Sequence, residues 1–287
     1  MIPREPFGRT GHESTRVIFG GWALSEGTLA EADRTLDLLD RYSINHIDVA
    51  PMYGKAEELV GPWLSHDRGR FFIATKTRSR TREAAWEDLK RSLDRLRTDA
   101  IDLWQLHGLT NPKGAAAALG PGGAIEALVE AREQGLVRYL GVTGHTPEAA
   151  AMHRKTLDAF EFDAVMLSYN YAFAQKPRYA ERFAELARTC EERGVALQTI
   201  KAVARRPWAG RSKTYHTYFY EPLVAQNAID TAVHWVLGHP RAFLVAVGDL
   251  QILPKVLKAA SRFEVRPSDD AMRTLVEKYD VRPIFGS

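Results

Sequence analysis

The sequence has a single cysteine, Cys190, among 287 residues. A lone thiol can form neither an internal disulfide nor a cysteine metal cluster, so we expect no metal site and a reducing, cytoplasmic setting. The opening residues, MIPREPFGRTGHESTR, lack the apolar core that a signal peptide needs. Nothing in this pattern indicates a secreted, disulfide-stapled protein.

Long hydrophobic runs and an excess of one charge are also missing. The apolar stretches around residues 115–125 and 164–175 are bounded by charges well short of the roughly 20 residues of a membrane span. Lys and Arg number 39 against 36 Asp and Glu, a net charge of +3, and the basic residues are scattered along the chain. We therefore expect a small-molecule partner, with neither nucleic acid nor a membrane, and leave the oligomeric state open.

What the sequence does have is a core-forming composition and a repeating pattern. Hydrophobic residues make up 45% and charged residues 26%, as in ordinary globular proteins. Short apolar runs alternate with amphipathic segments such as 81–97, a predicted helix with one apolar stripe. The predicted strands number eight: 16–20, 46–49, 71–75, 101–106, 139–143, 164–167, 195–200 and 243–247.

Eight strands that alternate with helices favour one α/β domain, residues 1–287, folded as a (β/α)₈ TIM barrel. An open doubly wound sheet is the competing fold. It is disfavoured because the first turn after a strand, FGGWALSEG, lacks the G-x-G-x-x-G spacing that seats a dinucleotide there. Segments 108–123 and 204–220 read as long loops after strands, where a barrel builds its active site, although they could also be plain surface loops.

Four ionisable side chains fall at the ends of consecutive predicted strands. Asp48 closes the second strand and Tyr53 follows in its loop, while Lys76 and His107 come at the ends of the third and fourth. Taken singly, each has a structural explanation, such as a loop hydrogen bond or a packed core side chain. A buried lysine needs a carboxylate partner, however, and Asp48 on the neighbouring strand supplies one. Together the four predict a catalytic site at one rim of the barrel.

This set of side chains suits proton transfer coupled to reduction. We expect the Lys76 ammonium to lower the pKa of Tyr53, so that the phenol can act as a general acid. Asp48 would keep Lys76 charged and oriented. Donors from Tyr53 and His107 would then stabilise negative charge that grows on a carbonyl oxygen when its carbon accepts a hydride.

The motifs DVAPMYGKAEELVG, ATKT and LWQLHG resemble, in this order and spacing, those of the aldo-keto reductase family. FGRTGHESTRVIFGGWAL is similar to that family's opening β-hairpin and first strand, and LGVTGHTPEAA, LSYNYA, GVALQTIKAV and FLVAVG extend the likeness over nearly the whole chain. The resemblance implies reversible reduction of an aldehyde or ketone, including sugar-type carbonyls, by NADPH or NADH. It assigns the catalytic tetrad to Asp48, Tyr53, Lys76 and His107.

The resemblance also implies cofactor contacts, here with departures from the family pattern. The expected contacts are Gly21, Trp22, Asp48, Thr143, Asn170, Lys201, Gly248 and Lys255. Trp22 is also a candidate wall of the substrate pocket. Many members have Ser-Asn where this chain has Thr143-Gly144, a glutamine where Met166 stands, and an aromatic residue at Ile200. Lys201 could approach a pyrophosphate or form a second salt bridge at the barrel mouth.

Two features at the eighth strand leave the choice of nicotinamide cofactor open. Lys255, Lys258 and Arg262 could bind the 2′-phosphate of NADPH, or form a solvated helix face. Asp249 would instead suit the ribose hydroxyl of NADH. The resemblance to the aldo-keto reductase family favours NADP, because members of that family usually bind the 2′-phosphate.

Two other functions compete with reduction. One is a Schiff-base lyase that uses Lys76 or Lys201 as an amine nucleophile. The other is a cofactor-sensing regulatory subunit with little turnover. It is suggested by the changes at Thr143-Gly144 and Met166, because the resemblance implies that the family's residues there contact the carboxamide of the nicotinamide.

Overall fold

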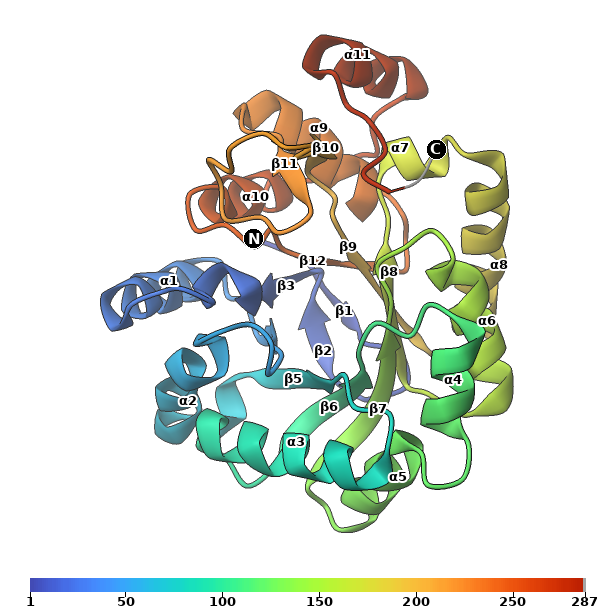
Figure 1. Ribbon diagram of the computed structural model, residues 1–287. Coiled ribbons are helices and arrows are strands. Elements are labelled where there is room, and N and C mark those ends of the chain that lie inside the picture. Colours follow the sequence, from blue (N-terminus) through green and yellow to red (C-terminus); the bar gives the residue numbers. More distant parts are fainter. Residues whose placement is uncertain (286–287) are drawn as a thin grey trace.

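Eight parallel strands close into a barrel in the computed structural model, which describes residues 1–285 (Figure 1). Around the barrel the strands are β12 (Ala242–Val245), β3 (Val17–Gly20), β4 (His46–Asp48), β5 (Phe72–Thr77), β6 (Ile101–Leu106), β7 (Val137–Thr143), β8 (Ala164–Ser168) and β9 (Ala196–Ile200). The predicted (β/α)₈ fold is confirmed, and the observed strand ends differ from the predicted ones by at most two residues.

The barrel interior is filled by side chains, so it is a core and not a channel. Phe72, Leu103, Met166 and Phe243 belong to one buried apolar cluster inside it. The N-terminal hairpin, β1 (Arg4–Pro6) and β2 (Glu13–Thr15), confirms the predicted hairpin. Its loop inserts Phe7, which is fully buried against Phe72 and Phe243. The hairpin therefore closes one end of the barrel and leaves the C-terminal ends of the strands to form the site.

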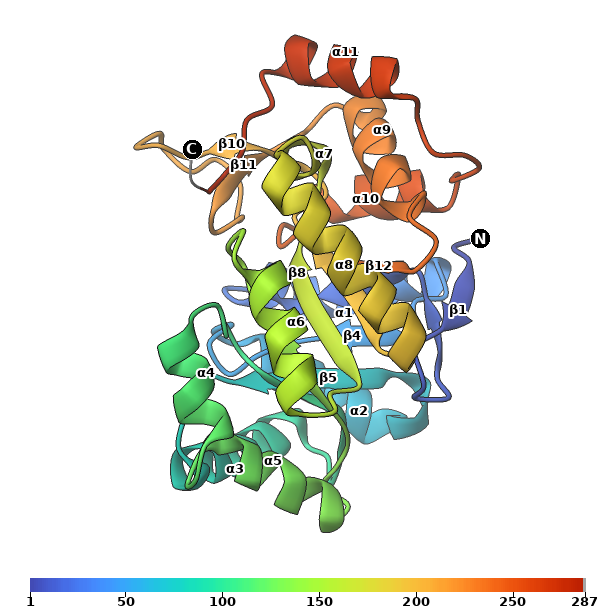
Figure 2. The same ribbon diagram turned by 90° about the vertical axis from the view of Figure 1, so that its right-hand side faces the viewer.

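Helices surround the barrel, some packing directly against its strands and others, such as the last one, packing on neighbouring helices. They are α1 (Leu29–Arg41), α2 (Ala56–His66), α3 (Arg82–Leu96), α4 (Pro112–Leu119), α5 (Ala124–Glu133), α6 (Ala149–Ala159), α7 (Tyr171–Ala174), α8 (Pro177–Arg193), α9 (Gln226–Leu237), α10 (Leu253–Ala260) and α11 (Asp269–Tyr279), with two short 3₁₀ turns at Gly21–Leu24 and Arg68–Arg70. Helix α3 confirms the predicted helix 81–97, with the Thr81 hydroxyl accepting a bond from Ala84 N at 3.4 Å. Figure 2 shows α6 and α8 lying along β8.

Two segments predicted as loops contain regular structure. Segment 108–123 holds α4, which starts at Pro112 after the Asn111 cap. Segment 204–220 begins with β10 (Ala204–Pro207), which pairs with β11 (Tyr220–Pro222) in a separate antiparallel hairpin. These short elements were predicted as loops because both segments are rich in proline, glycine or charged residues. Such residues are typical of loops, but they also occur at the starts of helices and the ends of hairpin strands. No helix within residues 1–285 is long and apolar enough to cross a bilayer.

Candidate active site

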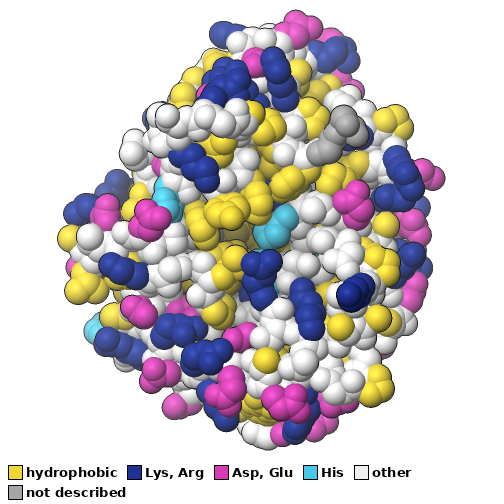
Figure 3. All heavy atoms as spheres, viewed as in Figure 1, with side chains coloured by type: hydrophobic (Ala, Val, Ile, Leu, Met, Phe, Trp, Pro, Cys, Tyr) yellow, Lys and Arg dark blue, Asp and Glu magenta, His cyan; other side chains and the backbone are white. Residues whose placement is uncertain are grey.

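A cavity of about 330 Å³ opens where the barrel strands end at their carboxyl termini. Its floor is apolar and includes Met166, Ile200 and Val245, from β8, β9 and β12. Asp48, Tyr53 and His107 line one side of it. Figure 3 shows this hollow near the centre of the face, with hydrophobic and histidine side chains around it. Three of the four residues predicted to share one rim therefore line one pocket, and Lys76 lies behind them against Asp48 and Tyr53.

Asp48 and Lys76 form a buried ion pair between neighbouring strands. The parallel register sets Asp48 of β4 beside Ala74 of β5, which brings Lys76 Nζ to 2.6 Å from Asp48 Oδ2. The ammonium also donates to Val49 O at 2.7 Å, and Gln105 Nε2 donates to Asp48 Oδ1 at 3.0 Å. Burial disfavours the ammonium, but the Asp48 carboxylate, with a smaller contribution from Tyr53, outweighs it and raises the pKa of Lys76. Lys76 is therefore held as a cation.

Tyr53 lies in the loop after β4, with Lys76 Nζ 4.8 Å from the centre of its ring. Burial raises the pKa of Tyr53 above its ordinary value, although the Lys76 cation opposes this. The expected lowering of this pKa was therefore wrong, because desolvation of the phenolate exceeds the attraction of the cation. The phenol stays protonated and available as a proton donor.

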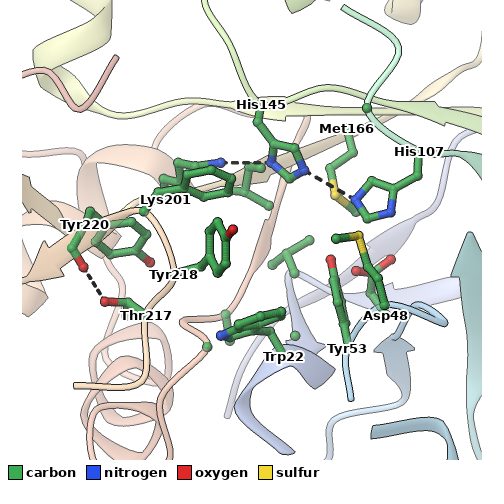
Figure 4. Close-up of a pocket in the computed structure, with 18 of the residues that line it drawn as sticks. Trp22, Asp48, Tyr53, His107, His145, Met166, Lys201, Thr217, Tyr218 and Tyr220 are labelled. Carbon is green, nitrogen blue, oxygen red and sulfur yellow. Dashed lines mark hydrogen bonds between the residues drawn. The ribbon is translucent and has the colours of Figure 1, made fainter. Parts of the chain in front are cut away.

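His107 follows β6 and is 4% exposed. Burial, followed by the charges of Lys76 and Arg78, lowers the pKa of His107 well below its usual value. Its ring lies 6.1 Å from that of Tyr53, centre to centre. Figure 4 shows both side chains pointing into the pocket near Asp48. A neutral imidazole and a protonated phenol thus face the same space.

His145 joins this group and was not among the predicted site residues. It follows β7, and its Nε2 lies 3.3 Å from His107 Nε2. On its other side, Nδ1 is 3.0 Å from Lys201 Nζ, so the three side chains form a hydrogen-bonded row (Figure 4). Burial, with Lys201 next, lowers the pKa of His145 well below its usual value. The available signal was its place just after a strand end, the same rule that picked out His107.

The predicted cofactor residues separate into two groups. Trp22, Asp48, Lys201 and Gly248 line the pocket, while Gly21 is buried next to it. Thr143, Asn170 and Lys255 do not line it.

The three outlying side chains are engaged elsewhere. Thr143 Oγ1 accepts a bond from Gly108 N at 3.2 Å. The Asn170 amide caps α7 by accepting from Phe173 N at 3.0 Å and donates to Lys201 O at 3.1 Å. Lys255 Nζ donates to Val224 O at 2.7 Å.

Asp249 and Arg262 are also occupied by structural contacts. The buried Asp249 carboxylate accepts backbone N–H bonds from His216, Gln251 and Ile252 at 2.6 to 3.0 Å. Arg262 pairs with Asp230 at 2.7 Å on the surface. The Asp249 carboxylate therefore braces the loop before α10, which weakens the expectation that it faces a ribose.

The chain between β10 and β11 covers one side of the pocket. Trp22 Nε1 donates to His216 O at 2.8 Å, and the two rings stack at 5.7 Å. Tyr218 packs edge-on against Trp22 and lines the cavity with Phe219. The predicted loop 204–220 therefore lies over the pocket, and Trp22 has a position in the pocket wall. The other predicted loop, 108–123, contributes Gly108 to the lining.

Chemically, the site can deliver a proton to an oxygen that is gaining negative charge. Tyr53 offers the proton, Lys76 stabilises the phenolate left behind, and the imidazole of His107 offers a neutral hydrogen bond. No group of three or more potential metal-ligating side chains occurs within the described residues.

Comparison with known proteins identifies the family. The model of the aldo/keto reductase family matches residues 16–241, and the chain belongs to this family. It is 25% identical to 6-dehydroglucose reductase of Novosphingobium aromaticivorans over 90% of each chain. It is also 34% identical to the uncharacterized oxidoreductase YqkF of Bacillus subtilis, over 43% of this chain and 44% of that protein. The match to YqkF thus spans less than half of each protein.

Solved structures show the same fold. An aldo-keto reductase from Bacillus halodurans in its holo form superposes with a TM-score of 0.68, over 97% of this chain and 96% of that one, at 22% identity. An aldo-keto reductase from Klebsiella pneumoniae in complex with NADPH gives a TM-score of 0.68, over 99% and 96%, at 18% identity.

Proposed function

We propose that the protein reversibly reduces an aldehyde or ketone to an alcohol with NADPH or NADH as the hydride donor, and that residues 1–287 form one catalytic domain. The observation that carries this proposal is the buried Lys76–Asp48 pair beside Tyr53, at the rim that also holds His107. A sugar-type carbonyl is the narrower proposal, supported by the name of the Novosphingobium relative. The free, buried Cys190 agrees with a cytoplasmic setting.

The pocket fits a nicotinamide cofactor. Met166, Ile200 and Val245 form an apolar floor for a flat ring. Gly248 lets the backbone pass close to Trp22 at the pocket edge, since a Cβ at this position would lie 2.4 Å from the indole. Trp22, Asp48, Gly248 and Lys201 are the predicted contacts that line this space, and Gly21, Thr143, Asn170 and Lys255 stay proposals further out. When bound, the cofactor supplies the hydride that adds to the carbonyl carbon.

The chain's own residues handle the proton and the developing charge. Tyr53 Oη donates its proton to the carbonyl oxygen, and Lys76 stabilises the phenolate that this leaves. Asp48 keeps Lys76 charged and fixed on the barrel wall. His107, a neutral imidazole, orients the substrate oxygen by donating from Nε2, which exchanges its contact with His145 Nε2 for the substrate. In the direction of oxidation, the phenolate takes the proton back.

A specific observation keeps the Schiff-base lyase as a second candidate. Lys76 is a poor nucleophile because its ammonium is held by Asp48, but burial lowers the pKa of Lys201 well below its usual value. A desolvated lysine in a pocket has the character of an amine nucleophile.

Borohydride trapping separates the two candidates. With the protein, a carbonyl substrate and borohydride together, we expect no covalent adduct on Lys76 or Lys201, because reduction needs no imine. Peptide mass spectrometry checks this. A reduced adduct on either lysine would overturn the reductase, whereas single-turnover oxidation of bound NADPH by a reactive aldehyde would exclude the regulatory subunit.

We predict that NADPH binds more tightly than NADH and that added salt narrows the difference. The Asp249 carboxylate is engaged by three backbone N–H groups, and Lys255 and Lys258 lie on the neighbouring helix α10. The contact would be partly exposed and hence screened by salt. Dissociation constants for both cofactors at two ionic strengths test this, with Lys255→Ala as the variant and Lys90→Ala on α3 as the control. Equal affinities that respond to neither salt nor Lys255→Ala would contradict it.

A further inference from the structure

Two basic side chains line the pocket without a carboxylate partner. Lys201 and Arg78 both face it, and none of the described residues forms an ion pair with either. Asp48, the carboxylate among the lining residues, is already held by Lys76. The pocket therefore offers basic side chains that no carboxylate neutralises, which favours an anionic ligand.

Lys201 is the more deeply placed of the two. The residue is 6% exposed, and within residues 1–285 its ammonium has one hydrogen-bonding partner, His145 Nδ1 at 3.0 Å. The rings of Phe219 and Phe285 lie 5.3 and 5.5 Å from Nζ and compensate part of the lost hydration. An ammonium has three N–H donors, so two remain for a ligand.

The backbone holds this lysine at some cost. Lys201 has φ +71°, in the left-handed region that residues other than glycine rarely adopt. Such a conformation persists where the surroundings fix it, and it tends to occur at functional sites. Here Asn170 fixes it, since its amide donates to Lys201 O at 3.1 Å.

Lys201 also lies close to the reacting atoms. One imidazole ring, that of His145, separates its ammonium from His107, with 3.3 Å between the two Nε2 atoms. Figure 4 shows Lys201 and His145 on the far side of the pocket from Tyr53. A small molecule with its carbonyl oxygen at Tyr53 and His107 would thus point a neighbouring substituent toward Lys201.

We propose that Lys201, oriented by His145, is an anion-binding subsite that takes the carboxylate of the carbonyl substrate, so that the substrates are aldehyde or keto acids with a short spacer. This rests on the proposed function and narrows its substrate class, and a sugar-type carbonyl that bears a carboxylate satisfies both. Burial lowers the pKa of Lys201 well below its usual value, and a carboxylate bound beside Nζ favours the charged form.

The test compares 4-oxobutanoate with its uncharged methyl ester, which present the same aldehyde. Wild type should show the higher kcat/KM with the acid. Lys201→Met and Lys201→Gln should lower the acid-to-ester ratio by roughly 10- to 100-fold, the usual range for losing a hydrogen bond to a charged group. The ratio cancels any general loss of activity or folded fraction. Lys213→Met, an exposed lysine in the same loop region, is the matched control and should leave the ratio unchanged.

Binding of unreactive analogues separates this proposal from the proposed function. Butanoate should bind more tightly than butanamide by calorimetry, and Lys201→Met should abolish the difference, whether or not the protein turns over any carbonyl. If no carbonyl is reduced but this difference appears, the reductase fails and the anion subsite stands.

Two results would overturn the subsite. In one, Lys201→Met weakens binding of both cofactors, measured by fluorescence, but leaves the acid-to-ester ratio as in wild type; Lys201 then serves the cofactor's phosphates. In the other, Arg78→Gln and not Lys201→Met removes the preference for the acid, which places the anion at the end of β5.

Discussion

Tyr53→Phe will lower kcat for carbonyl reduction by about 10²- to 10⁴-fold, the range that general acid catalysis contributes. The phenol stays protonated in the pocket because burial raises its pKa, and Lys76 is placed to stabilise the phenolate once the proton leaves. Phenylalanine keeps the ring and removes only the hydroxyl. Single-turnover rates with a saturating aldehyde measure the chemical step directly.

Cofactor binding is the control for this variant. Tyr53 acts on the substrate oxygen, so the dissociation constants for NADPH and NADH should stay close to those of wild type. Tyr218→Phe removes a hydroxyl from another pocket tyrosine and should retain activity. A wild-type single-turnover rate for Tyr53→Phe would remove Tyr53 from the role of proton donor.

The fold could be predicted because its signals are local. Each barrel strand was predicted from a short apolar run of four to six residues. The proposed catalytic residues followed from the same signal, since Asp48, Lys76 and His107 occupy ends of consecutive strands that a closed barrel must bring together. Tyr53 needed the additional assumption that its loop turns back over the rim.

What could not be predicted depends on contacts between distant segments. Asn170 and Asp249 read as ligand-binding residues, but the structure uses them as caps for nearby backbone N–H groups. The row from His107 through His145 to Lys201 joins the ends of β6, β7 and β9, and nothing in sequence spacing fixes those distances.

The direction of the pKa shift of Tyr53 could not be predicted from the sequence either. The sequence identified a cation that lowers this pKa, and Lys76 does act in that direction. The depth of burial, which has the opposite effect, is a property of the assembled loops around the pocket. Whether the pKa of Tyr53 rises or falls when the two effects are combined could therefore be known only from the structure.

Lys76→Met should reduce kcat about as strongly as Tyr53→Phe, by roughly 10²- to 10⁴-fold. The cause differs, because this variant keeps the phenol and removes the cation beside it. Without the ammonium nothing opposes the burial of Tyr53, so the pKa of the phenol rises further above its ordinary value. In the direction of alcohol oxidation the phenolate must accept a proton, and the rate climbs as pH rises through this pKa. The pH profile of oxidation should therefore move to higher pH in Lys76→Met, which measurements of kcat across the alkaline range would show.

Stability must be measured alongside, because Lys76→Met leaves the Asp48 carboxylate buried without its ion partner. Breaking one side of a buried pair costs about 3 to 5 kcal/mol of unfolding free energy. The double variant Asp48→Asn/Lys76→Met removes both charges, so urea unfolding should return most of that loss while kcat stays low. If the double variant instead recovers the wild-type rate, Lys76 acts only by neutralising Asp48. An unshifted oxidation profile in a folded Lys76→Met protein would show that the ammonium does not act on Tyr53.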